Sequence, residues 1–90
     1  MKIVFDRTAW DDYEYWIQQD RRVIKRINAL IKDITRGAEN LEPNVGVGKP
    51  EALKHSLHGY WSRRINDEHR LVYKVEGDEL RIASCRFHYE

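Results

Sequence analysis

Cysteine is nearly absent from this chain of 90 residues, which contains only Cys85. A lone cysteine excludes an internal disulfide and fits the reducing cytosol. Long apolar runs are also lacking, because no stretch approaches the roughly 18 residues of a membrane-spanning helix. The first residues turn charged by Asp6 and lack the apolar core of a signal peptide. We therefore expect a cytoplasmic protein that does not bind membranes.

Net charge is also nearly absent, at +1, but it is distributed unevenly along the chain. Residues 1–48 balance to zero, whereas residues 49–74 carry six Lys or Arg against three acidic side chains. Residues 75–90 carry two basic against four acidic side chains. The excess of positive charge over 49–74 is a weak but local indication of a polyanionic partner.

The hydrophobic pattern begins with a short strand over 2–5, followed by two helices. We expect Thr8 to cap the first helix, Asp20 to cap the second, and Gly37 to end the second. The second helix has an apolar stripe at spacings of one, three and four residues, formed by Val23, Ile24, Ile27, Leu30, Ile31 and Ile34. With no linker or repeat in the chain, residues 1–90 are expected to form a single domain.

In the last third of the chain the period changes to two. Residues 60–65, 69–76 and 79–87 read as three strands joined by short turns, which predicts an antiparallel meander. With the first strand alongside, the prediction is an α+β fold whose antiparallel sheet has about four strands and two N-terminal helices on one face. Residues 37–50 form a long loop of the kind that is often functional or mobile, and residues 51–55 are expected to form a helical turn.

Strand alternation places Arg70 on the sheet face away from the helices, and Arg64 with it if the hairpin register allows. Two guanidinium groups on one open face need an anion or a carboxylate. The pattern supports two interpretations equally: a binding site for a phosphate, or surface salt bridges to Glu51 or Glu68.

Cleavage of RNA without a metal needs four groups. These are a base for the ribose 2′-hydroxyl, a cation for the pentacoordinate phosphate, an acid for the leaving 5′-oxygen, and a platform for the nucleotide. A carboxylate or neutral amine, an arginine, a histidine and an aromatic ring can fill these roles. The chain supplies each type in Glu51, Lys54, Arg64, Arg70, His88 and Tyr89.

Ordinary structural explanations compete with these roles. Glu51 directly follows Pro50, as a first-turn residue of a helix often does, and a lysine such as Lys54 is more often a solvated cation than a catalytic one. His88 fits a core poorly because it lies so near the last residue. No metal-site spacing with cysteines or paired carboxylates connects the other histidines, which are His55, His58 and His69. We expect no metal and no cofactor.

Five segments of the chain carry a resemblance to a known family. They are Ala9–Tyr13, Gly48–His55, Gly59–Ile65, Glu68–Tyr73 and Cys85–Tyr89. Taken together and in order, they resemble the YoeB/Txe branch of the RelE/ParE toxin superfamily, whose members are ribosome-dependent mRNA endonucleases of bacterial type II toxin–antitoxin modules. The resemblance covers essentially the whole chain and implies a RelE-like fold and this activity.

The resemblance implies a role for each matching residue. The catalytic set would be Glu51, Arg70, His88 and Tyr89, and the substrate-binding set would be Lys49, Lys54 and Arg64. Arg70 would clamp the phosphate, His88 would be the acid, and Tyr89 would position the scissile nucleotide. Glu51 would be the base, although Lys54 stays an alternative for that role.

The resemblance also implies partners. These are the ribosome and its mRNA, a cognate antitoxin of the YefM/Phd-like type, and operator DNA only in complex with that antitoxin; a homodimer is also compatible. Two other functions of the superfamily remain open: a gyrase-binding toxin without nuclease chemistry, and an RNA- or operator-binding co-repressor. Three features depart from the family pattern: a longer loop over 37–48, Phe87 in place of a commoner tyrosine, and an added Glu90.

Overall fold

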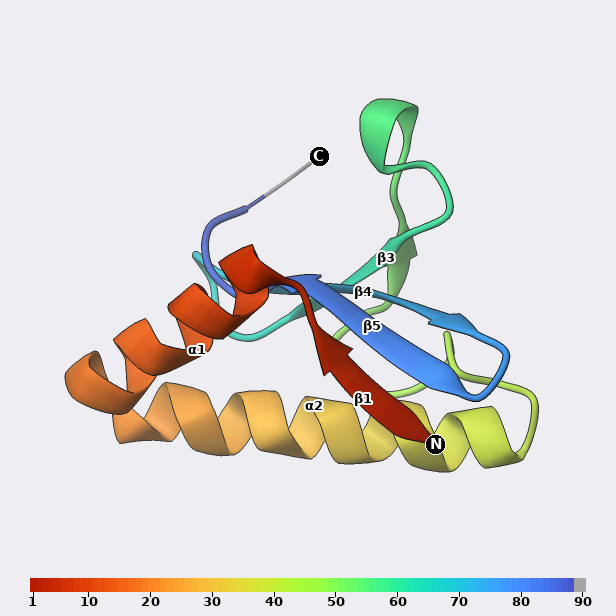
Figure 1. Cartoon of the computed structure of the whole chain (residues 1–90), viewed down its shortest axis with the longest axis horizontal. Helices are drawn as coiled ribbons and strands as arrows, with labels where there is room; N and C mark the ends of the chain where they lie inside the picture. Colours follow the sequence, from red (N-terminus) through yellow and green to blue (C-terminus); the bar gives the residue numbers. More distant parts are fainter. Residues whose placement is uncertain (89–90) are drawn as a thin grey trace.

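The computed structural model describes residues 1–88, in which two helices cover one face of a mixed β-sheet (Figure 1). In chain order the elements are β1 (Lys2–Phe5), α1 (Arg7–Gln19), α2 (Arg21–Glu39), β2 (Glu51–Ala52), a 3₁₀ turn η1 (His55–Leu57), β3 (Trp61–Arg64), β4 (Arg70–Glu76) and β5 (Glu79–Ser84). This arrangement confirms the predicted α+β class with both helices before the meander. No helix within residues 1–88 is long and apolar enough to cross a lipid bilayer.

The sheet of the described residues has five strands in the order β1-β5-β4-β3-β2. β1 runs parallel to β5 at one edge, and the other neighbours are antiparallel. The predicted count of about four rises to five because Glu51 pairs with Ser62 of β3. The helical turn expected over 51–55 was therefore wrong at its start, and the 3₁₀ turn begins only at His55.

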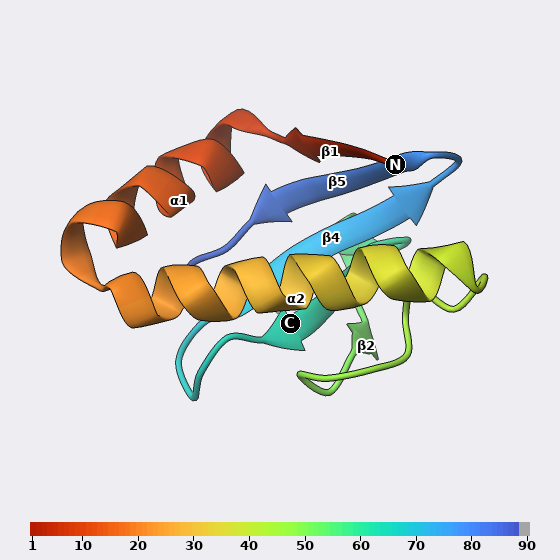
Figure 2. The ribbon, with the colours of Figure 1, turned by 90° about the horizontal axis from the view of Figure 1, so that it is seen from below.

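α2 buries its apolar stripe against the sheet, as predicted. Figure 2 shows this helix lying across the strands on the helical face. Five of the six stripe residues are buried and Ile24 is partly buried against them. The predicted cap is also confirmed, because the Arg22 backbone N–H donates to Asp20 Oδ1 at 3.0 Å. Burial of such a stripe is the main source of stability in an amphipathic helix.

Two helix boundaries and one strand end differ from the prediction. α1 begins at Arg7 rather than after Thr8, and the Asp6 side chain at its N-cap position accepts a hydrogen bond from Arg81 at 2.8 Å. α2 continues past Gly37 to Glu39, because the Gly37 carbonyl accepts from the backbone N–H groups of the turn that follows. β5 ends at Ser84 rather than at residue 87. Propensity alone places such ends only within a few residues.

Arg63 is a fully buried arginine that organises the loop between α2 and β2. Its guanidinium donates to Asp33 Oδ2 of α2 and to the Tyr73 hydroxyl. It also donates to the backbone carbonyls of Pro43 at 2.8 Å, Val45 at 3.3 Å and Val47 at 3.0 Å. All five guanidinium N–H groups therefore have an acceptor. The loop before β2, which the sequence suggested could be mobile, is therefore anchored by the buried guanidinium of Arg63.

The end of this loop is also tied to β3 immediately before β2 begins. The Arg64 backbone N–H donates to the Gly48 carbonyl at 2.7 Å. Gly48 has a φ of +86°, and a Cβ there would lie 3.0 Å from the Leu30 side chain and 3.1 Å from Cβ of Arg63. Only glycine fits both constraints without strain. Arg63 and Gly48 together therefore determine where Glu51 enters the sheet.

We expect Asp33→Asn to destabilise the fold in a pH-dependent manner. The hydrogen bond from Arg63 lowers the pKa of Asp33 below its usual value of 3.8. A carboxyl with a lowered folded pKa adds stability above its unfolded pKa and loses it as pH falls through the folded value. The variant should lose about 3 kcal/mol at pH 7, the low end for leaving a buried charge unpaired. Denaturant unfolding should show this difference shrinking below about pH 4.

Asp11→Asn is the matched control for this measurement. Asp11 pairs with Arg7 at 3.2 Å, but the two side chains are 56% and 87% exposed. Exposed pairs of this kind contribute little to stability. Equal losses in the two variants at pH 7 would contradict the anchoring role of Arg63.

Candidate functional site

The candidate site lies on the sheet face opposite the helices. In the β3–β4 register Arg64 pairs with Arg70, and Ser62 pairs with both Val72 and Glu51. Directly paired residues of antiparallel strands project to the same face. The predicted juxtaposition of the two arginines is thus present. The expectation that Arg70 is exposed was wrong, because only 8% of its surface is accessible.

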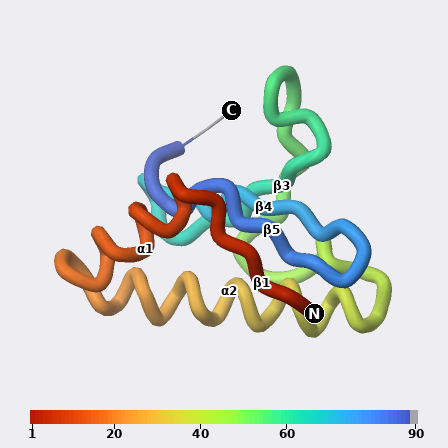
Figure 3. The backbone as a smooth tube through the Cα atoms, in the orientation of Figure 1, coloured from red at the N-terminus to blue at the C-terminus, as the bar shows by residue number. Residues whose placement is uncertain are grey.

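Arg70 is buried because neighbouring segments rise on both sides of it and form a groove. The arm formed by β2 and η1 rises from the sheet, and the backbone after β5 rises from the same side (Figure 3). Between them lies a groove of about 540 Å³ lined by Glu51, Ala52, Leu53, Lys54, His55, Arg70 and His88. Three segments far apart in the sequence therefore meet there, and the nearly buried Arg70 is part of the groove lining.

The Arg70 guanidinium is only partly paired. Its Nη1 donates to Ser62 Oγ at 3.3 Å, and the same nitrogen lies 3.9 Å from Glu51 Oε1. That distance exceeds a hydrogen bond. Within residues 1–88 no ion pair joins Arg70 or Arg64 to Glu68. The salt-bridge interpretation therefore holds only as a loose contact between Arg70 and Glu51, which leaves guanidinium donors available to an anion.

The remaining predicted residues divide into three groups. Lys54 lines the groove together with Glu51, Arg70 and His88. Lys49 and Arg64 are exposed but lie outside the groove lining, and Lys49 has a left-handed φ of 51° just before β2. Tyr89, predicted as the nucleotide platform, lies outside the described residues, and so does Glu90.

Sequence reasoning did not assign two residues that belong to this site. Ser62 Oγ accepts a hydrogen bond from Arg70 Nη1, and His55 is one of the residues that line the groove. Alternation along β3 puts Ser62 on the same face as Arg64, so the period of two could have indicated its position beside Arg70. The position of His55 could not be predicted in this way, because η1 has only three residues and shows no repeating hydrophobic pattern.

Cys85 is not a nucleophile of this site. It is buried, and burial raises the pKa of its thiol to about 12. A thiol with such a pKa is almost wholly protonated at neutral pH. Within residues 1–88, no group of three or more His, Cys, Asp and Glu side chains is arranged to hold a metal ion. The chemistry that the groove offers is therefore that of carboxylate, guanidinium, amine and imidazole groups.

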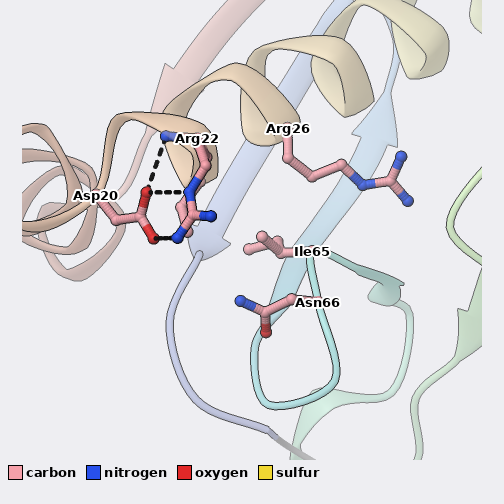
Figure 4. A pocket seen from close by; sticks show the side chains of 6 residues that line it. Asp20, Arg22, Arg26, Ile65 and Asn66 are labelled. Carbon is pink, nitrogen blue, oxygen red and sulfur yellow. Dashed lines mark hydrogen bonds and ion pairs between the residues drawn. The ribbon is translucent and has the colours of Figure 1, made fainter.

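A second hollow, of about 340 Å³, lies where α2 begins and meets the β3–β4 turn. Figure 4 shows Asp20 turned toward Arg22, with Arg26, Ile65 and Asn66 around the opening. Arg22 is held by Asp20 through contacts of 3.3 Å, and Arg26 donates to the Arg64 carbonyl at 3.2 Å. No predicted catalytic side chain lines this hollow, so the groove over Arg70 is the better candidate.

Comparison with known proteins agrees with this geometry. Residues 5–89 match the model of the family described as the YoeB-like toxin of bacterial type II toxin–antitoxin systems. The chain belongs to the YoeB toxin family. The Toxin YoeB of Escherichia coli strain K12 is 55% identical over 89 residues, which is 99% of this chain and 100% of that protein.

Solved structures of YoeB proteins have the same fold as this YoeB-family chain. The YoeB dimer from Staphylococcus aureus superposes with a TM-score of 0.88 at 48% identity, over 99% of this chain and 98% of that one. A YoeB–YefM complex from the same organism gives 0.86 at 47% identity, with the same coverage. Near-complete coverage in both directions shows that this chain has the RelE-like α+β fold of a YoeB toxin.

Proposed function

We propose that this YoeB-family toxin is a ribosome-dependent endoribonuclease that cuts mRNA in the ribosomal A site and so inhibits translation. One observation carries the proposal: Glu51, Lys54, Arg70 and His88 line a single groove although they come from three separate parts of the chain. Titratable groups of complementary type that converge in one groove are typical of a catalytic site.

The proposed reaction is an in-line displacement at phosphorus without a metal. A base, Glu51 or Lys54, takes the proton of the ribose 2′-hydroxyl, whose oxygen attacks the phosphate. Arg70 stabilises the charge of the pentacoordinate phosphate. As the bond to the 5′-oxygen breaks, His88 gives that oxygen a proton. The products are a 2′,3′-cyclic phosphate and a 5′-hydroxyl end. Tyr89 is proposed to hold the scissile nucleotide by stacking.

The proposed partners follow from the relatives. A YoeB from Staphylococcus aureus is known in complex with YefM and as a dimer. We propose a YefM/Phd-like antitoxin for this chain, a homodimer of the free toxin, and binding to operator DNA only together with the antitoxin. Lys49 and Arg64, both exposed beside the groove, are proposed to contact the message or the ribosome.

The test uses ribosomes stalled on a defined message and purified toxin, in a buffer that keeps the Mg²⁺ on which ribosome assembly depends. We expect cuts near the A-site codon that leave 2′,3′-cyclic phosphate or 3′-phosphate and 5′-hydroxyl ends. An intact message alongside gyrase-dependent DNA breaks would replace the proposal with a gyrase-binding toxin. A shift in RNA mobility without cleavage would replace it with a binding protein.

A further inference from the structure

The backbone after β5 is held by side chains from other elements and by one backbone hydrogen bond to the start of β4. The Cys85 N–H donates to Asp12 Oδ2 at 3.0 Å, and the Cys85 carbonyl accepts from Trp16 Nε1 at 2.8 Å. Two residues later the Phe87 N–H donates to His69 Nδ1 at 2.8 Å, and the Phe87 carbonyl accepts from the Arg70 N–H at 3.0 Å. These bonds explain why β5 ends at Ser84.

The contact between Phe87 and His69 defines the chemical state of this imidazole. A backbone N–H can only donate, so Nδ1 must present a lone pair and the ring proton must be on Nε2. A protonated imidazole has N–H groups on both nitrogens. Protonation would therefore place an N–H of His69 against the N–H of Phe87, and the hydrogen bond would be lost.

The backbone conformation of Phe87 depends on contacts with neighbouring residues. Its φ is 69°, a left-handed conformation that bulky residues rarely adopt. Such a conformation persists only where the surroundings impose it. Consecutive residues, His69 and Arg70, hold its N–H and its carbonyl. His88, the next residue, is thereby attached to the start of β4, where Arg70 faces the groove.

The surroundings of His69 are aromatic and charged. Its ring packs edge-on against Trp16 at 4.8 Å between centroids and lies 6.2 Å from the Phe87 ring. Asp12 of α1 interacts electrostatically with both His69 and Arg86. Arg86 lies 4.5 Å over the Phe87 ring. The other charged or titratable neighbours along the chain are Asp67 and Glu68 of its own turn, Arg70 of β4 and His88 after Phe87.

We propose that His69 is a positioning residue that couples pH to the placement of His88. In its neutral form it holds the Phe87 peptide and with it His88 in the groove with Arg70. When it is protonated, Nδ1 no longer accepts a hydrogen bond and the ring releases that peptide. The inference rests on the proposed function in one respect: His88 matters for cleavage only if the groove is the nuclease site.

The direct test follows the Phe87 amide in the full-length protein by NMR. Across pH 5 to 8 we expect its chemical shift and its protection from hydrogen exchange to change together with the ring nitrogens of His69. His69→Asn keeps an acceptor, because Oδ1 is bonded to Cγ as Nδ1 is, but it does not titrate in this range. In that variant Phe87 should stay protected throughout. An unchanged pH step in His69→Asn would overturn the inference.

Two further variants are needed: His69→Phe removes the acceptor, and His58→Asn is the control. His69→Phe keeps a ring against Trp16 but has no acceptor, so Phe87 should be unprotected at every pH. His58 is exposed and outside the groove lining, so His58→Asn should behave as wild type. If His69→Phe does not fold, the pH comparison between wild type and His69→Asn decides alone.

Cleavage of ribosome-bound message gives the second readout. We expect His69→Phe to lower kcat about 10²-fold with little change in KM, because a displaced catalytic group typically costs about that much. His69→Asn should restore the rate and keep it at lower pH than wild type. A variant His69→Phe with wild-type kcat would overturn the positioning role. A wild type that cuts no message would reject the proposed function, whereas the NMR result would still decide how Phe87 is held.

Discussion

Arg70→Ala is expected to cut ribosome-bound message about 10²–10³-fold more slowly than wild type. Arg70 lines the groove, and its guanidinium donates a hydrogen bond to Ser62 Oγ at 3.3 Å. The phosphate gains negative charge in the pentacoordinate state, and a fixed cation in a partly enclosed site stabilises that state more than the ground state. The loss should therefore appear in kcat, measured as single-turnover cleavage with saturating toxin.

Arg70→Lys separates charge from geometry. Lysine keeps the cation but lacks the planar fork that can donate two bonds to a phosphate, so an intermediate rate is expected. Lys74→Ala is the matched control, since Lys74 lies on the same strand but over the Tyr60 ring at 4.9 Å and outside the groove lining. A rate for Arg70→Ala within a few-fold of Lys74→Ala would rule out Arg70 as the phosphate clamp.

Replacement of His88 by alanine should have an effect of similar size, about 10²–10³-fold, for a different reason. His88 is exposed and lines the groove that also contains Glu51 and Arg70. A general acid matters because an unprotonated 5′-oxygen is a poor leaving group. A message with sulfur in place of the bridging 5′-oxygen needs no such proton. This substrate should restore the rate of His88→Ala and leave Arg70→Ala impaired.

His58→Ala provides the matched control for this variant, because it removes an exposed histidine outside the groove. It should cleave both messages at the wild-type rate. If the sulfur-containing message failed to rescue His88→Ala, the acid role would have to pass to another group, such as His55 on the wall of the groove.

The helical half of the fold was predictable because its signal is local. The stripe along α2 repeats for about three turns, from Val23 to Ile34, and each member reports independently on which face is buried. By contrast, β2 is a strand of two residues, too short for alternation to be visible. Its pairing depends on Arg63, whose guanidinium gathers three loop carbonyls. An arginine at a core-facing position of β3 is a signal for a buried ion pair, and Asp33 near the α2 stripe is its partner.

The sequence by itself determined the type of the longer elements, the face of the sheet on which Arg70 lies, and the chemical groups available for catalysis. These properties follow from periods of two and 3.6 residues and from side-chain identity. Only the tertiary structure decided that Glu51, Arg70 and His88 line one groove. Their proximity depends on a two-residue strand pairing, a buried Arg63 and a left-handed Phe87. Contacts between residues so distant along the chain leave no local pattern from which they could be predicted.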